Sequence, residues 1–181
     1  MKIFVSIAGF QDPILPYTIE SALQNAKYKN DIVLGVFDQS KDVLDYKDKT
    51  NIRYMNCHPK EAKGACWARS KIQKDLFAGE DIFMQVDSHT MFGENWDSDL
   101  LAKYETCYNW FQKPLLTGYP RGFNVFNGPF LNTKEKYIFK YCTEEPETNV
   151  MTIHLPFADG LHGGQVAKSM SDSKYYRGFA L

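Results

Sequence analysis

Long apolar runs are missing from this sequence. None approaches the ~20 residues that a membrane-spanning helix requires, so we expect no transmembrane segment. The N-terminus carries one charged residue, Lys2, before a short apolar run, which is typical of a first strand and not of a signal peptide. No block of Lys and Arg occurs, and the formal net charge is −1 at pH 7. The charge pattern therefore gives no support for nucleic-acid binding.

Cysteine is scarce and scattered. The four cysteines form no Cys-x-x-Cys pair, and the chain has 181 residues. This pattern indicates buried free thiols in a reducing compartment instead of a disulfide framework. The four are Cys57, Cys66, Cys107 and Cys142. We therefore expect a cytoplasmic protein, or a domain of a larger one.

Several catalytic signatures are also absent. There is no GxxxxGK(S/T) phosphate-binding loop, no GxGxxG after the first apolar segment, no HExxH and no GxSxG. The first segment also lacks the Gly-rich signature of the sugar-phosphate nucleotidyltransferases. These absences argue against the most easily recognised nucleotide-binding enzymes and hydrolases.

Strand-like and helix-like patterns alternate along the first half of the chain. Strands are predicted at 3–8, 32–37, 51–57 and 81–86, of which the first two are expected to be buried. Helices are predicted from about residue 15, at 63–78 and after Asn95. Asn95 can cap the third helix, with Asp97 and Asp99 near its positive end. The alternation predicts an α/β fold with a mainly parallel, doubly wound sheet. Such sheets bind ligands beyond the carboxyl ends of their strands, here residues 9–12, 38–39 and 87–89.

The second half is less regular. We expect a short fifth strand at 113–118 and a loop at 119–129, where glycines, aromatics and asparagines are mixed. Segments 137–142, 151–155 and 165–170 could add antiparallel strands. His154 and His162 lie in this half and are more often structural or surface residues than ligands.

The sequence Val86-Asp87-Ser88-His89 places a carboxylate and an imidazole two positions apart at a strand end. Alternation puts residues i and i+2 on the same side, so Asp87 and His89 could share one divalent ion. An oxygen and a nitrogen ligand suit Mn²⁺, with nucleotide phosphates and water in the remaining positions. In the alternative, Asp87 caps the next loop and His89 is an ordinary surface histidine.

Two further positions are candidates. Gly64 would let the backbone approach a ligand at a helix start, and Arg69, one turn later, could reach a diphosphate or the carboxylates of a metal site. A solvated helix face explains the same residues. Asp38 directly follows the second buried strand and could accept the N3–H of a uracil ring, although a turn-forming Asp is equally consistent.

Together these segments resemble the GlcNAc-transferases that act on hydroxyproline or similar protein hydroxyls. Residues 4–13 resemble that family's "VSIASYRDP", residues 63–69 its "KGxCWAR", and residues 85–97 its "QIDSHMRFxxxWD". The order and the gaps match as well, over about residues 3–120. The mucin-type GalNAc-transferases carry a similar Asp-Ser-His.

The resemblance implies a GT-A fold, a UDP-sugar donor such as UDP-GlcNAc, dependence on Mn²⁺ (or Mg²⁺), retention of configuration and a hydroxyl acceptor on a protein or glycan. Asp87 and His89 would be the metal ligands, and Arg69 would bind the donor. Asp12 and Asp38 take a nucleotide-side role by position. Residues of the same motifs complete the candidate donor site: Ser6, Lys63, Gly64 and Ser88.

Two departures from the family accompany the resemblance. Gln11 stands where the family has a basic residue, which would weaken donor binding or alter the acceptor. The family also continues beyond the point matched by Leu181 with an acidic Gly-Glu-Glu segment. We therefore expect a single domain, 1–181, with a donor-binding part to about residue 120 and an incomplete acceptor-side part at 121–181.

The sequence thus leaves three functions open. The first is a metal-dependent glycosyltransferase. The second is a nucleotide-sugar-binding module that has lost transfer. The third is a metal-dependent hydrolase that uses Asp87 and His89 with His154 or His162.

Overall fold

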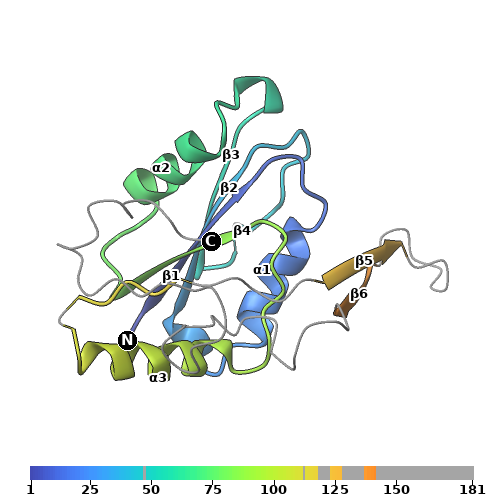
Figure 1. Ribbon diagram of the computed structural model, residues 1–181. Coiled ribbons are helices and arrows are strands. Elements are labelled where there is room, and N and C mark those ends of the chain that lie inside the picture. The colour runs from blue at the N-terminus through green and yellow to red at the C-terminus, as the bar shows by residue number, and fades with distance from the viewer. Residues whose placement is uncertain (47, 112, 118–122, 128–136, 142–181) are drawn as a thin grey trace.

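A four-stranded parallel sheet organises the part of the chain that the computed structural model describes, which is residues 1–46, 48–111, 113–117, 123–127 and 137–141 (Figure 1). Its strands are β1 (Ile3–Gly9), β2 (Ile32–Asp38), β3 (Ile52–Asn56) and β4 (Ile82–Asp87). They lie in the order β3-β2-β1-β4, and every neighbouring pair is parallel. The predicted α/β class is confirmed, and the arrangement is Rossmann-like.

Helices cover both faces of the sheet. Helices α1 (Leu15–Gln24) and α3 (Trp96–Tyr108) pack on one face, against side chains such as Val5 and Ile7. Helix α2 (Ala65–Asp75) packs on the other face, where Phe4 lies (Figure 1). Because β1 is covered on both sides, it is apolar at nearly every position, as the sequence indicated.

The helix predictions hold for α1 and need correction for α2. The apolar stripe of α1, predicted at Leu15, Ile19, Ala22, Leu23 and Ala26, is buried except at the partly buried Leu23, and Ala26 lies just beyond the end of the helix. Helix α2 is shorter than the predicted 63–78, and Ala65 is exposed, so only Ala68 and Ile72 are fully buried. Leu76 follows the last helical residue and is only partly buried, although it still packs against the core under α2.

One glycine of the sheet is required by close packing. A Cβ at Gly35 would lie 2.1 Å from Cζ of Phe4, whose ring is completely buried over the neighbouring strand. That ring also contacts Phe77 and Phe83, with centroid distances of 5.3 and 5.5 Å. The smaller core under α2 is therefore built around one aromatic ring that only glycine can accommodate.

The strand order creates a switch point between β1 and β4. From β1 the chain moves through α1 to β2, and from β3 it crosses back through α2 to β4 on the other side of β1. The loops that leave the carboxyl ends of β1 and β4 lead to α1 and α3 on the same face of the sheet. Ligands of open α/β sheets bind at such a point.

The second half departs from the prediction. Residues 113–117 form no strand beyond an isolated bridge at Leu115, and β5 (Phe123–Asn127) lies where a loop was expected. Strand β6 (Tyr137–Tyr141) confirms the strand predicted at 137–142 and pairs antiparallel with β5. Long-range pairing has overridden the low strand propensity of the asparagines in β5. The strands predicted at 151–155 and 165–170, together with His154 and His162, lie outside the described residues.

The cysteines are only partly as expected. Cys57, Cys66 and Cys107 are free thiols, but Cys66 is exposed instead of buried. Burial raises the pKa of the Cys57 and Cys107 thiols. Cys142 lies outside the described residues. Within those residues, no helix is both long enough and apolar enough to cross a membrane.

Candidate functional site

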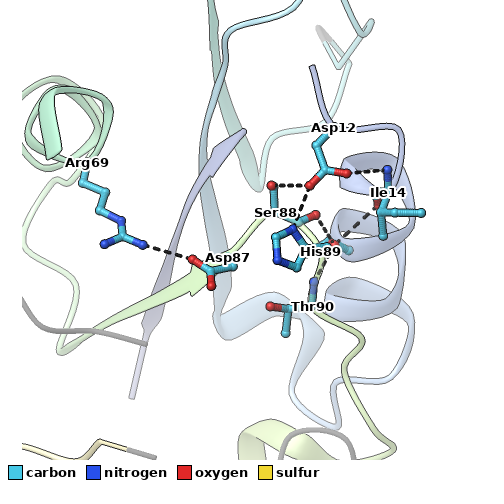
Figure 2. A network of polar contacts seen from close by, with 8 residues as sticks. Asp12, Ile14, Arg69, Asp87, Ser88, His89 and Thr90 are labelled. Atoms are coloured by element: carbon cyan, nitrogen blue, oxygen red, sulfur yellow. Dashed lines mark hydrogen bonds and ion pairs between the residues drawn. The ribbon is translucent and has the colours of Figure 1, made fainter. Parts of the chain in front are cut away.

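The loops after β1 and β4 meet through the side chain of Asp12. Its Oδ2 accepts a hydrogen bond from Ser88 Oγ at 2.5 Å and lies 3.0 Å from His89 Nδ1. Its Oδ1 accepts from the backbone N–H of Ile14 at 2.9 Å. Figure 2 shows the three residues Asp12, Ser88 and His89 converging at the end of β4. One carboxylate therefore connects the two loops at the switch point of the sheet.

The surroundings of Asp12 favour its charged form. Burial on its own would raise the pKa of Asp12, whose side chain is 14% exposed. Hydrogen bonds from Ser88 and Ile14, and the contact with His89, outweigh burial and hold the pKa below the ordinary value of 3.8. Asp12 is thus an anion at neutral pH, and it is sheltered from solvent.

Asp87 is held from the opposite side, by α2. Arg69 Nη2 donates to Asp87 Oδ1 at 3.0 Å (Figure 2). Gln85, two residues earlier on the same face of β4, accepts from Arg69 Nε at 2.7 Å and Nη1 at 3.2 Å when its amide oxygen faces the guanidinium. The planar cation is therefore fixed by two side chains of β4.

The loop that carries Ser88 and His89 is attached to α1. Thr18 Oγ1 donates to Ser88 O at 2.6 Å and accepts from Thr90 N at 3.1 Å, so it grips the backbone on both sides of His89. Ser21 Oγ accepts from Phe92 N at 3.2 Å. Asn25 Nδ2 donates to Phe92 O at 2.6 Å. These three polar residues recur at helical spacing along the covered side of α1, a signal in the sequence that a prediction based on apolar spacing alone does not use.

The same loop is pinned again where α3 begins. The fully buried Asp97 accepts from the backbone N–H groups of Lys27 and Tyr28, at 2.7 Å each, just beyond the end of α1. Asn95 adopts a left-handed conformation and makes no side-chain capping bond, so its predicted capping role is wrong. Asp97 lies in the first turn of α3, as predicted, and it also bonds α3 to the segment that follows α1. The loop from Ser88 to Asn95 is thus fixed at both ends.

Asp38 sits in a different environment at the neighbouring strand ends. Its side chain is 2% exposed, and its two oxygens accept from Ser40 Oγ at 2.5 Å and Tyr54 OH at 2.9 Å. Burial, reinforced by the nearby Asp38 carboxylate, raises the pKa of Tyr54 to about 12. Asp38 is therefore buried and bonded to the protein through both oxygens, and the uracil contact suggested by its sequence position stays a prediction.

The other candidates lie outside this network. Ser6 is fully buried in the middle of β1, and its Oγ has no partner within the described residues. Lys63 and Gly64 are exposed where α2 begins, with Lys63 Nζ 5.8 Å from the centre of the Trp67 ring. Gly64 has φ +89° and open space around it. The structure thus places Arg69 against Asp87, and Asp12 against Ser88 and His89, and it leaves Ser6, Lys63 and Gly64 outside these contacts.

The exposed atoms of this network suit a divalent cation. The Asp87 and His89 side chains are 52% and 64% exposed. Within the described residues, no hydrogen bond reaches Asp87 Oδ2 or His89 Nε2, which leaves one carboxylate oxygen and one imidazole nitrogen at the same rim. No group of three or more His, Cys, Asp or Glu side chains in the described part of the chain could hold a metal ion. Ligands from a phosphate or from water would have to complete such a site.

A family model described as Glycosyltransferase (GlcNAc) matches residues 40–171. The match covers more than half of the chain and includes Arg69, Asp87, Ser88 and His89, while Asp12 and Asp38 precede it. No curated protein matches the chain, and no solved structure does.

Proposed function

Since the chain belongs to the glycosyltransferase (GlcNAc) family and is therefore a sugar-transferring enzyme, we propose that it moves GlcNAc from UDP-GlcNAc to a hydroxyl of a protein or glycan, with retention of configuration and with Mn²⁺. The donor, the cation, the stereochemistry and the acceptor are parts of this proposal. The compartment is proposed to be the cytoplasm.

One observation supports the proposal above all others. An exposed carboxylate with a guanidinium fixed against it, and an exposed imidazole two residues later, lie at the end of β4, beside the switch point of a parallel sheet (Figure 2). Ligands bind at this place in open α/β folds, and a diphosphate requires positive charge there. Asp87, His89 and Arg69 supply the two kinds of group that a cation–diphosphate complex needs.

Each residue has a distinct task in this proposal. Asp87 Oδ2 and His89 Nε2 bind the cation. Arg69 stays fixed against Gln85 and presents positive charge to the diphosphate. When bound, Mn²⁺ would supply Lewis-acid neutralisation of the charge that develops on departing UDP. No enzyme nucleophile is required, because the leaving phosphate can take the proton of the acceptor hydroxyl.

Asp38 takes a supporting part. Because both its oxygens are engaged and its side chain is buried, we assign it to the framework that holds the ends of β2 and β3 together. Asn56 strengthens the same framework by donating to the backbone oxygens of Asp38 at 2.9 Å and Ser40 at 3.1 Å. Contact with the nucleotide would fall to other groups at this rim.

Calorimetry with UDP, in the presence and absence of Mn²⁺, tests the proposal. We expect Mn²⁺ to strengthen UDP binding in the wild type, and Asp87→Ala and His89→Ala each to remove that gain. Asp99→Ala is the matched control, because Asp99 is an exposed carboxylate on α3, far from the carboxyl ends of the strands. The assignment is wrong if both site variants keep the full Mn²⁺ effect. Tight Mn²⁺ binding without UDP would instead favour a hydrolase-type metal site.

A further inference from the structure

Asp12 joins the two halves of the site, and it does so through the ring of His89. It belongs to the loop after β1, whereas His89 belongs to the loop after β4, 77 positions later. We propose that Asp12 is a positioning residue that holds Nδ1 of His89 and so presents Nε2 to the cation. This inference rests on the proposed function and replaces the nucleotide-side role suggested by sequence position.

The chemistry of the contact fixes which nitrogen carries the proton. A neutral imidazole has one N–H donor and one acceptor nitrogen, and a carboxylate only accepts. The 3.0 Å distance between Asp12 Oδ2 and His89 Nδ1 therefore requires the proton on Nδ1. The lone pair then lies on Nε2, at the end of the ring that faces outward. Histidines that bind metals commonly donate their other N–H to a carboxylate in this way.

Asp12 is itself held too firmly to act as a mobile ligand. The N–H of Ile14, at the start of α1, fixes Oδ1, and the Ser88 hydroxyl fixes Oδ2. Gln11 has φ 48°, a left-handed turn that leads the chain from β1 into this arrangement. With both oxygens engaged and most of its surface covered, Asp12 can orient a neighbour better than it can grip a ligand of its own.

Backbone and ring of His89 are thus fixed by different residues. Thr18 holds the carbonyl before His89 and the N–H after it, which sets where the ring begins. Asp12 sets how the ring is turned. Thr18 belongs to α1, and Asp12 belongs to the loop just before α1. One short stretch of the chain therefore orients the imidazole for the cation.

The experiment compares wild type, Asp12→Ala, Asp12→Asn, His89→Ala and the double variant Asp12→Ala/His89→Ala. Nitrogen-15 NMR of the metal-free protein, at a pH where imidazole is neutral, reads the tautomer of His89. Electron paramagnetic resonance of free Mn²⁺, at a fixed UDP concentration, reads the affinity for the cation. Thermal unfolding reports stability separately, and Ser88→Ala is the control that loosens Asp12 without touching the ring.

We expect the Nδ1–H tautomer in the wild type and a mixture in Asp12→Ala, with Mn²⁺ affinity lower by about 10- to 100-fold. Asp12→Asn should retain much of the affinity, because an amide oxygen still accepts from Nδ1–H. In the His89→Ala background, removing Asp12 should not weaken Mn²⁺ binding further, because Asp12 acts through the missing ring. Ser88→Ala should have a smaller effect than Asp12→Ala.

Three results would overturn the inference while leaving the proposed function standing. One is a wild-type His89 that carries its proton on Nε2, a measurement that needs no variant. Another is an Asp12→Ala protein with unchanged Mn²⁺ affinity. The third is an equal loss from Asp12→Ala with and without His89, which would mean direct contact or general destabilisation. A wild type that does not bind Mn²⁺ with UDP overturns the proposed function and this inference together.

Discussion

Two carboxylates stand at the ends of buried strands of the same sheet, Asp38 at the end of β2 and Asp87 at the end of β4, and they have opposite surroundings. Asp38 is buried, and both its oxygens accept hydrogen bonds from side chains of the protein. Asp87 is half exposed and uses one oxygen, toward Arg69. An Asp at the end of an apolar strand is therefore a structural support in one place and an available ligand in the other.

The difference arises from the path of the segment that follows each strand. The segment between β2 and β3 folds back onto the sheet, where Leu44 and Tyr46 pack against the core and Tyr54 covers Asp38. The segment after β4 is instead drawn along α1 by Thr18, Ser21 and Asn25. One loop closes over its carboxylate, and the other is held away from it.

The largest effect should come from the exposed carboxylate. Asp87→Ala is expected to lower the rate of sugar transfer, or of UDP-sugar hydrolysis, by about 100-fold or more, because the cation that would neutralise the charge on departing UDP loses a ligand. Its melting temperature should change little, since Asp87 is half exposed. Rate assays with Mn²⁺ and thermal unfolding of the same samples check both halves. An Asp87→Ala protein with a lower melting temperature and an unchanged rate would mean that Asp87, and not Asp38, is the structural carboxylate.

The buried carboxylate should show the reverse pattern. Asp38→Ala leaves the Tyr54 and Ser40 hydroxyls without an acceptor, so we expect a loss of about 2 kcal/mol or more in the free energy of unfolding. Asp38→Asn should lose less, because the amide oxygen still accepts. Urea unfolding measures the stability, and UDP calorimetry should show affinity close to wild type under folding conditions. A folded Asp38→Ala protein with lost UDP binding would restore the nucleotide role to Asp38.

A third effect concerns the attachment of the site loop. Thr18→Val keeps the shape of the side chain but removes the hydroxyl that binds Ser88 O and Thr90 N, so about 1–3 kcal/mol of stability should be lost. The Mn²⁺ effect on UDP binding should weaken as well. Thr106→Val is the matched control, because the Thr106 hydroxyl donates only to Ala102 O on the exposed side of α3. Equal losses in the two variants would contradict a special role for Thr18.

The strands and helices with a clear apolar pattern could be predicted from the sequence. Strands β1 and β2 are short apolar runs, and the buried stripe of α1 recurs at helical spacing, so these elements could be predicted. Asp87 ends β4 and His89 follows in the next turn, as their place in the sequence indicated, whereas a shared cation stays a prediction. The link from Asp12 to His89 and the position of Arg69 depend on contacts between distant segments, which no local window contains.

The features that the sequence did not predict share one cause. The burial of Asp38 and Asp97 was not predicted, and hydrogen-bond donors from other segments of the chain, such as Tyr54 and Lys27, accompany it. Asn95 looked like a helix cap, yet its backbone N–H is bonded to Asn25 O at 2.7 Å and its side chain does not cap. Strand β5 forms against β6 despite its asparagines. In each case a long-range partner decides what a local preference leaves open.

The smallest effect is a dependence of stability on pH that belongs to Asp12. Its pKa is lower in the folded protein than the ordinary value of 3.8, so the folded state holds its proton less tightly than the unfolded state does. The stabilisation is therefore fully present above that ordinary value and is lost as the pH falls through the lowered pKa.

Asp12→Asn, which does not titrate at this position, should lack this pH-dependent component of stability. Unfolding of both proteins across the acid range should give curves that differ most at neutral pH and converge in acid. A difference in the free energy of unfolding that is the same at every pH would mean that the charge of Asp12 does not contribute to stability. Asp12 would then act as a structural hydrogen-bond acceptor, as Asp38 does.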